Sequence, residues 1–237
     1  MRLAMWSGPR NISTAMMYSF YQREDFCAVD EPFYAYYLAQ TGLQHPMTEE
    51  VLAYQPHEAE AVIAQLELTA QAAEHQYEKH MSQHILPTTP LDWLSDVTNV
   101  FLIRHPVRVA ASFADRYENP QAADLGFGVQ ADLFARLQAE GKTPIVLDSA
   151  DVRRDPEGML RKLCDALELE WVEAMLSWPK GGCAADGVWA PHWYAAVHGS
   201  TGFAGAEGPM PVLDGRLAEL AEELMPHYEA LYEFRLS

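Results

Sequence analysis

The chain has 237 residues, of which 49% are hydrophobic and 21% are charged, as in an ordinary globular protein long enough for one large domain. Its formal net charge of −18 at pH 7 argues against sequence-independent binding to DNA or RNA, because such binding needs many lysines and arginines to neutralise phosphates. No apolar run approaches the roughly 18 residues that are needed to span a bilayer.

The first residues of the chain and its cysteines bear on the cellular compartment in which we expect the protein. The first residues, MRLAMWSG, lack the long apolar core of a secretory signal. The cysteines are three in number and widely spaced, which predicts reduced thiols rather than a disulfide framework. We therefore expect a cytoplasmic protein that binds neither nucleic acid nor membrane.

Predicted strands and helices alternate along the chain. Short apolar runs predict strands at 2–6, 26–30, 99–104 and 143–148. Apolar residues at helical spacing predict helices at 11–22, 32–39, 58–75 and about 216–232, the last disturbed near Pro226. The Gly-, Pro- and aromatic-rich stretch 178–215 is predicted to be loop.

Two features refine this outline. Asp155, Pro156 and Glu157 predict another helix, because each residue suits a helix start. The runs 99–104 and 143–148 are almost entirely apolar, which is typical of strands buried on both faces. The pattern predicts an α/β fold, a three-layer sandwich with a central parallel sheet, in a single domain spanning 1–237. In such folds ligands bind at the carboxyl ends of the strands.

The stretch SGPRNIST, residues 7–14, lies between the first predicted strand and helix. Backbone N–H groups at a helix start attract anions, and the Arg10 guanidinium can grip two oxygens. Ser13 and Thr14 add hydroxyl groups. The Walker pattern is absent because Thr14 stands where that pattern has lysine, which disfavours an ordinary ATPase or kinase. The alternative is that Arg10 pairs with an acid while the hydroxyls satisfy the helix start.

A second candidate anion site lies in FLIRHPVRVAASF, residues 101–113. Arg104 ends a predicted strand, Pro106 can open a helix, and Ser112 lies two turns along it. A cation at a strand end with a hydroxyl on the next helix fits a phosphate, although Arg104 and Arg108 could instead be structural ion-pair partners. We expect two separate cationic pockets, built around Arg10 and Arg104, that face each other across one sheet edge.

Four segments together carry a resemblance to a known family. PRNIST (9–14) is similar to a P-[KR]-S-G-T-T loop, and RHPVRVAAS (104–112) matches the pattern R-x-P-x-x-x-x-x-S. The stretch 146–169 and GVWAPHWY (187–194) are weaker matches. In this order they resemble the sulfotransferases that use 3′-phosphoadenosine 5′-phosphosulfate (PAPS), over nearly the whole chain. The chain departs from that family where Asn11-Ile12 replaces Ser-Gly, and the basic residues usual in the last loop are not evident around 182–189.

The resemblance implies a P-loop-like nucleotide-binding fold and transfer of a sulfuryl group from PAPS, as co-substrate, to a hydroxyl or amine of a small-molecule acceptor. By position, Arg10, Asn11, Ser13 and Thr14 would bind the phosphosulfate, and Arg104 and Ser112 would bind the 3′-phosphate. Lys79 matches the family's lysine near the leaving oxygen, and Arg10 would also stabilise the leaving group. No metal is required.

The resemblance leaves two candidates for the catalytic base. Glu31 follows the second predicted strand, where bacterial members place a carboxylate, although it could simply cap the helix after Pro32. His80 is one residue early relative to the family's histidine, with Met81 at that position. Because a one-residue shift in a strand turns a side chain to the opposite face, we favour Glu31.

Aromatic residues and other enzyme classes leave further alternatives open. One set of aromatic side chains either walls an acceptor pocket or forms plain core: Phe33, Tyr34, Tyr36, Tyr37, Trp189, Trp193 and Tyr194. A nucleotide-binding phosphotransferase or hydrolase on the same fold is a second reading, opposed by the missing Walker lysine. A non-catalytic nucleotide-binding protein is a third, favoured by the altered loop.

Overall fold

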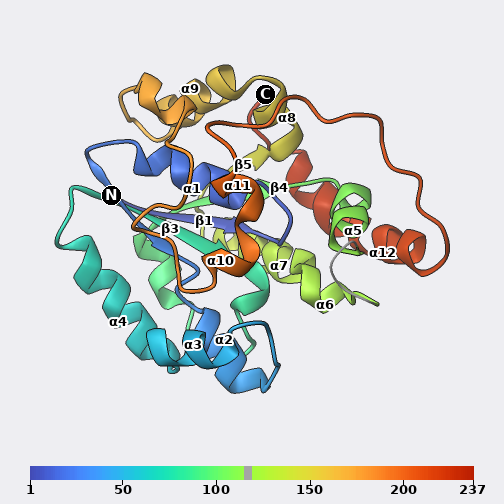
Figure 1. The fold of residues 1–237 in the computed structure, drawn as a ribbon, viewed down its shortest axis with the longest axis horizontal. Coiled ribbons are helices and arrows are strands. Elements are labelled where there is room, and N and C mark those ends of the chain that lie inside the picture. The colour runs from blue at the N-terminus through green and yellow to red at the C-terminus, as the bar shows by residue number, and fades with distance from the viewer. Residues whose placement is uncertain (115–118) are drawn as a thin grey trace.

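The computed structural model describes residues 1–114 and 119–237, which form an α/β protein around a central sheet (Figure 1). Within these residues the sheet has five strands, β1 (Arg2–Ser7), β2 (Phe26–Asp30), β3 (His75–Met81), β4 (Thr98–Ile103) and β5 (Ile145–Asp148). Their order is β2-β3-β1-β4-β5, and every neighbouring pair is parallel.

Helices connect and cover the strands. The α-helices are α1 (Ser13–Tyr21), α2 (Tyr34–Thr41), α3 (Thr48–Tyr54), α4 (Ala59–Ala70), α5 (Pro106–Ala114), α6 (Ala122–Leu125), α7 (Phe127–Ala139), α8 (Ser149–Arg154), α9 (Pro156–Ala166), α10 (Ala190–Trp193), α11 (Ala195–His198) and α12 (Gly215–Tyr232). Short 3-10 turns are η1 (Ser82–His84), η2 (Asp92–Asp96) and η3 (Glu173–Leu176). None of the helices described is both long enough and apolar enough to cross a membrane.

The sheet is buried on both faces, because consecutive apolar residues in strands such as β1 point their side chains to opposite faces. In β1, Leu3 and Met5 pack into the cluster beneath α1, α8 and α9, whereas Ala4 and Trp6 pack into the cluster beneath α4, α5, α7 and α12. This alternation follows from the two-residue period of a strand. The result is three layers, helix–sheet–helix, which confirms the predicted fold class.

Several predicted boundaries are wrong for identifiable reasons. The helix expected over 58–75 ends at Ala70, because the chain must turn before His75 pairs with Phe26. The predicted loop 178–215 contains α10 and α11, whose single turns are too short to show a period. Pro226 lies inside α12 without ending it, since buried residues continue on one face across it at Leu224 and Tyr228.

The topology selects one edge of the sheet for ligand binding. After β1 the chain runs toward β2 at one edge strand of the sheet, and after β4 it runs toward β5 at the opposite edge strand. The loops after β1 and β4 therefore flank the switch point at the carboxyl ends of the strands, where open α/β sheets bind ligands. These loops carry Arg10 and Arg104.

Candidate active site

The loop after β1 is packed tightly against neighbouring elements. A Cβ added at Gly8 would lie 2.5 Å from the Leu125 carbonyl oxygen, so only glycine permits this approach to the end of α6. Asn11 is buried, and its Nδ2 donates to the Leu102 carbonyl of β4 at 2.6 Å. Ser13 and Thr14 form the first turn of α1.

The side chains of the two motif arginines link the loop after β1 to the loop after β4 and to α5. Arg10 Nε donates to Ser112 Oγ at 2.9 Å, so its side chain reaches from the first motif to α5. Arg104 Nη1 donates in turn to the Arg10 carbonyl oxygen. Both arginines therefore lie at one sheet edge, as expected, and the assignment of a separate pocket to each stays a prediction. Because β1 and β4 are neighbours about 5 Å apart, a long arginine side chain spans both loops and makes one continuous cationic edge.

A carboxylate lies against this cationic edge. Glu207, in the loop before α12, forms ion pairs with Arg104 at 2.6 Å, Arg108 at 2.7 Å and Arg153 at 3.0 Å. The alternative that Arg104 and Arg108 are ion-pair partners thus describes the structure as it stands. Arg153 lies in the weakly matching stretch 146–169 without an assigned role, and Glu207 belongs to none of the four matching segments.

A second polar cluster lies at the ends of β2 and β3. Lys79 Nζ is 2.9 Å from Asp30 Oδ1, 2.6 Å from Glu31 Oε1 and 2.6 Å from the Tyr194 hydroxyl. The register of the sheet explains the first contact, because Asp30 and Lys79 are direct partners across β2 and β3. The structure therefore brings the predicted residues Glu31 and Lys79 together, with a Lys79 side chain that is 1% exposed.

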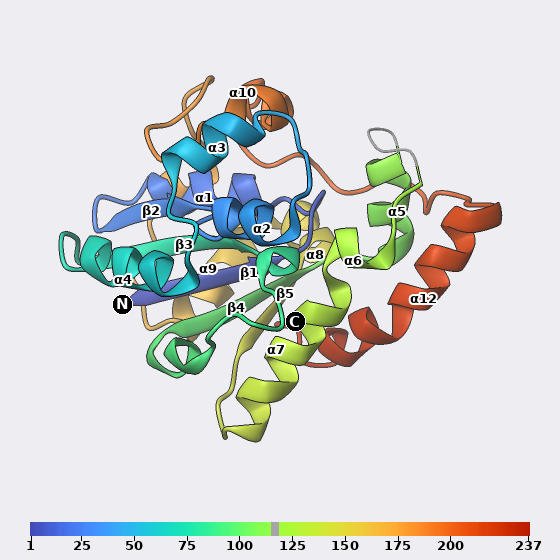
Figure 2. The same ribbon diagram turned by 90° about the horizontal axis from the view of Figure 1, so that it is seen from below.

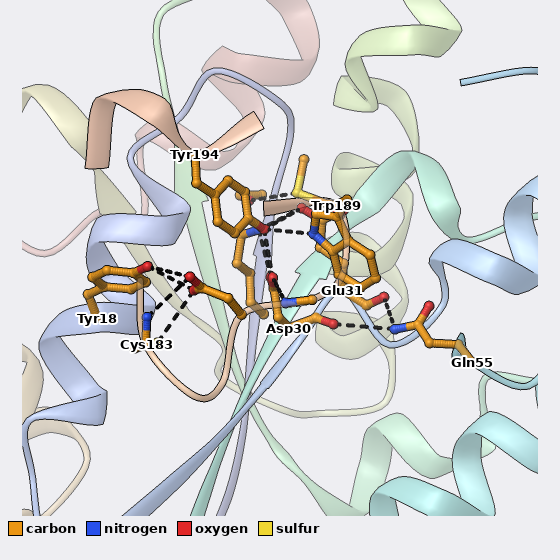
Figure 3. Close-up of polar contacts among 12 residues, drawn as sticks. Tyr18, Asp30, Glu31, Gln55, Cys183, Trp189 and Tyr194 are labelled. Carbon is orange, nitrogen blue, oxygen red and sulfur yellow. Dashed lines mark hydrogen bonds and ion pairs between the residues drawn. The ribbon is translucent and has the colours of Figure 1, made fainter. Parts of the chain in front are cut away.

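Tyr194 and Trp189 close this cluster from the segment around α10 (Figure 3). The Tyr194 hydroxyl lies 2.8 Å from Asp30 Oδ2 and accepts a hydrogen bond from Trp189 Nε1 at 3.0 Å. The Gly187 backbone N–H donates to Asp30 Oδ2 at 3.1 Å. Asp30 lies outside the matched motifs, and its place directly before Glu31 at the strand end is the signal that could have identified it.

Burial and charge set the protonation of the cluster. Burial raises the pKa of Asp30, and the Lys79 ammonium opposes that rise. Burial lowers the pKa of Lys79, but the carboxylates of Asp30 and Glu31 outweigh it and the net pKa is raised. Burial and Asp30 raise the pKa of Tyr194 well above its ordinary value, so the phenol keeps its proton.

The two carboxylates differ in access. The Glu31 side chain is 12% exposed, whereas that of Asp30 is fully enclosed by its partners. Glu31 has a φ of 40°, and its carbonyl accepts from Gln55 Nε2 at 3.0 Å. Its backbone conformation is uncommon for a non-glycine residue, and these contacts hold it. Glu31 is thus the carboxylate that can meet a bound molecule.

His80 points away from this cluster, as the one-residue shift predicts. Its ring stacks on Trp6 at 4.3 Å between centroids, and its Nε2 lies 3.0 Å from Glu78 Oε2. Burial lowers the pKa of His80, and the Glu78 contact opposes this without reversing it. The side chain is enclosed on the opposite face from Lys79, so it has no access to a reacting group.

The predicted aromatic set is mostly core. Four of its members pack together where α2, α3 and α10 lie side by side (Figure 2): Tyr34, Tyr37, Trp189 and Tyr194. Phe33 and Tyr36 belong to the larger core cluster that includes β1 and α4. The plain-core alternative therefore describes these six residues, and Trp193 is partly buried against the first group.

Known proteins are similar to this chain in sequence and in fold. A sequence profile described as "Sulfotransferase domain" matches residues 1–234. Two curated proteins of Arabidopsis thaliana, branched-chain-amino-acid aminotransferase-like proteins 1 and 2, are 37% and 34% identical over 226 residues. That match covers 95% of this chain but 40% of each relative, so the chain spans about two fifths of their length.

Solved structures share the fold. The sulfotransferase from Alicyclobacillus acidocaldarius has a TM-score of 0.56 at 13% identity, covering 99% of this chain and 96% of that protein. The sulfotransferase domain of the curacin biosynthetic pathway has a TM-score of 0.52 at 16% identity, covering 94% and 96%. At such identities the likeness concerns the fold alone. The profile match, by contrast, covers nearly every residue, including both arginine motifs and the Glu31–Lys79 pair: the chain belongs to the sulfotransferase family.

Proposed function

We propose that this sulfotransferase moves a sulfuryl group from PAPS to a hydroxyl or amine of a small-molecule acceptor. The observation that carries the proposal is the contact of Glu31 with Lys79 at the same sheet edge as the arginine-bearing loops. A base and a cation for the acceptor thus share an edge with the cations suited to a bisphosphate. Residues 1–237 act as a single domain in this proposal, and the cytoplasm remains the predicted location.

The residues of the donor side fit an anionic nucleotide. Arg10, the N–H groups at the start of α1 and the hydroxyls of Ser13 and Thr14 would bind the phosphosulfate. Arg104 and Ser112 would bind the 3′-phosphate, and the cluster around Glu207 shows that Arg104 can hold a carboxylate anion. Ile12 packs against the core cluster under α1, so its side chain is directed into the protein interior.

The residues of the acceptor side supply a base and a cation. Glu31 accepts the acceptor's proton while the new S–O or S–N bond forms and the S–O bond to the donor breaks, releasing the adenosine bisphosphate. Lys79 stabilises negative charge that develops on the oxygens, and Asp30 and Tyr194 position Lys79. The rate enhancement then comes from positioning and from fixed charges.

Donor binding is tested by thermal unfolding with 3′,5′-adenosine bisphosphate or ATP–Mg²⁺. A ligand that binds the native state alone raises the melting temperature by mass action, so we expect a rise with the bisphosphate and none with ATP–Mg²⁺. The reverse result would favour a phosphotransferase or hydrolase. Stabilisation by the bisphosphate without sulfuryl turnover would favour the non-catalytic reading.

The base is tested by Glu31→Gln. Loss of general-base catalysis should lower kcat by about 10²-fold or more, while affinity for the bisphosphate stays near wild type. Glu24→Gln, at an exposed position between α1 and β2, is the matched control and should retain full activity. Sulfuryl transfer by Glu31→Gln at the wild-type rate would remove Glu31 from the mechanism.

A further inference from the structure

The segment 204–214, here named the strap, joins the loop after α11 to α12 along the outside of the molecule (Figure 1). It has no helix or strand of its own, and most of its residues are exposed. Val212 is 97% exposed and Met210 is 45% exposed. The Glu207 side chain is the contrast, since it is 4% exposed.

Arginine side chains attach the strap to the body of the protein. The Glu207 carboxylate pairs with Arg104 Nη2 at 2.6 Å, Arg108 Nε at 2.7 Å and Arg153 Nη1 at 3.0 Å. Arg108 Nη2 also donates to the Gly208 carbonyl at 2.6 Å, and Arg153 Nε donates to the Gly205 carbonyl at 3.0 Å. The strap therefore depends on the arginine cluster of Arg104, Arg108 and Arg153.

The strap is anchored on both sides of these contacts. Before it, the Trp178 backbone N–H donates to the Thr201 carbonyl at 3.2 Å, and the Phe203 ring lies 5.3 Å from the Trp178 ring. After it, α12 is packed into the core through Leu220 and Leu224. Release of Glu207 would thus free the strap as a loop tethered at fixed ends and would leave the core intact.

The chemistry of the arginine cluster suits a phosphate better than a carboxylate. Guanidinium N–H donors bind carboxylate and phosphate oxygens in the same geometry. The single negative charge of Glu207 neutralises only one of the three arginines that it contacts. A phosphate group carries up to two negative charges and has one more oxygen atom that can accept hydrogen bonds. A carboxylate and a phosphate cannot share this cluster, because like charges at contact distance repel strongly where solvent is partly excluded.

We propose that Glu207 is an internal anion that competes with the 3′-phosphate of the nucleotide for Arg104, Arg108 and Arg153, so that nucleotide binding releases the strap. This inference rests on the proposed function, which assigns Arg104 to that phosphate. Glu207 then determines how strongly the enzyme prefers a 3′-phosphorylated nucleotide, since it lowers affinity for that group and for no other part of the ligand. It also couples occupation of the donor site to the conformation of 204–214.

Calorimetric titration of three proteins with two ligands tests the competition. Glu207→Gln should bind 3′,5′-adenosine bisphosphate about tenfold more tightly than wild type, because the competing charge is gone. Asp214→Asn removes the same charge from an exposed residue at the end of the strap and should match wild type. Adenosine 5′-monophosphate, which lacks the 3′-phosphate, should bind wild type and Glu207→Gln with equal affinity.

Each other outcome is decisive. If wild type and Glu207→Gln bind the bisphosphate equally, or if Glu207→Gln binds it more weakly, the competition is refuted while the proposed donor stands. If neither protein binds the bisphosphate, the proposed donor fails and the inference falls with it. Circular dichroism and the melting temperature confirm that the variants are folded.

A measurement on the wild-type protein needs no variant. A protease that cleaves beside large apolar residues should cut the strap near Met210 and Val212 severalfold faster when 3′,5′-adenosine bisphosphate is present. Adenosine 5′-monophosphate should leave the rate unchanged. Cleavage that is unaffected or slowed by the bisphosphate would contradict release of the strap.

Discussion

Lys79 is a buried ammonium group whose position is fixed by acidic neighbours. Its Nζ lies within 2.9 Å of Asp30 and 2.6 Å of Glu31, and the Tyr194 hydroxyl completes its partners. A charge this deeply enclosed is tolerated because its partners are charged and hydrogen-bonded. The Lys79 cation and the candidate base Glu31 are therefore in direct contact, so a change to one side chain alters the electrostatic surroundings of the other.

We expect Lys79→Met to lower both stability and activity. Removing the cation leaves the carboxylates of Asp30 and Glu31 facing each other without compensation, which should reduce the free energy of unfolding by about 3–5 kcal/mol. Urea unfolding measures this loss, and part of it should be recovered at pH 5, because burial raises the pKa of Asp30 and lets it take up a proton there. Lys162→Met on the exposed face of α9 is the control and should change stability little. A loss as small as that of the control would show that Lys79 does not stabilise the pair.

At the scale of elements, the loop after β1 is positioned by what packs over it. Gly8 lies against the Leu125 carbonyl at the end of α6, and Asn11 is bonded to β4. The loop is therefore held by two elements distant in sequence, which fixes the start of α1 and the backbone of Arg10. Arg10 itself has a φ of 57°, an uncommon value for a non-glycine residue.

Gly8→Ala tests this close packing. The added methyl group would lie 2.5 Å from the Leu125 oxygen, so the loop or α6 must move, at about 1–3 kcal/mol of stability. Gly128→Ala in α7 is the matched control, because its methyl group would meet only ordinary contacts near His227, and it should stabilise the helix by about 0.5–1 kcal/mol. Thermal unfolding of both variants gives the comparison, and equal effects of the same sign would contradict the packing argument.

At the scale of the whole molecule, the burial of several histidines makes stability depend on pH. Burial lowers the pKa of His45, His80 and His105, and lowers that of His84 well below its ordinary value. The His84 ring is stacked between Tyr34 at 4.7 Å and Tyr37 at 4.9 Å. Below about pH 6.5 the unfolded chain therefore binds protons that the folded chain rejects, and stability falls as the pH decreases.

His84→Gln should remove part of this acid sensitivity. Between pH 6.5 and 5.5 the wild-type protein should lose up to about 1.4 kcal/mol more of its unfolding free energy than the variant, the limit for one proton per pH unit. Asp30 has a raised pKa and contributes the opposite slope in both proteins, so the difference between them isolates His84. Urea unfolding at several pH values measures it, with His57→Gln at an exposed site as control. Parallel pH profiles for wild type and His84→Gln would refute this assignment.

Short-range features of the chain were predictable because they depend on a few neighbouring residues. The short apolar runs at 2–6, 26–30, 99–104 and 143–148 predicted strands that the structure contains. Arg10 and Arg104 could be placed at one edge because parallel strands end at the same edge of a sheet. The boundary at Ala70 depends on the pairing of His75 with Phe26, which no local pattern shows, and the single turns of α10 and α11 are too short to show a period.

The sequence by itself determined the α/β alternation, the two arginine motifs and the pairing of Glu31 with a strand end. The tertiary structure alone decided that Tyr194 closes on Lys79 across 115 residues and that Glu207 reaches Arg104 across 103 residues. Periodicity and motif spacing act over a few residues of chain, whereas these contacts depend on how the sheet and its helices bring distant loops together. No local sequence pattern therefore predicts that Glu207 contacts Arg104 or that Tyr194 contacts Lys79.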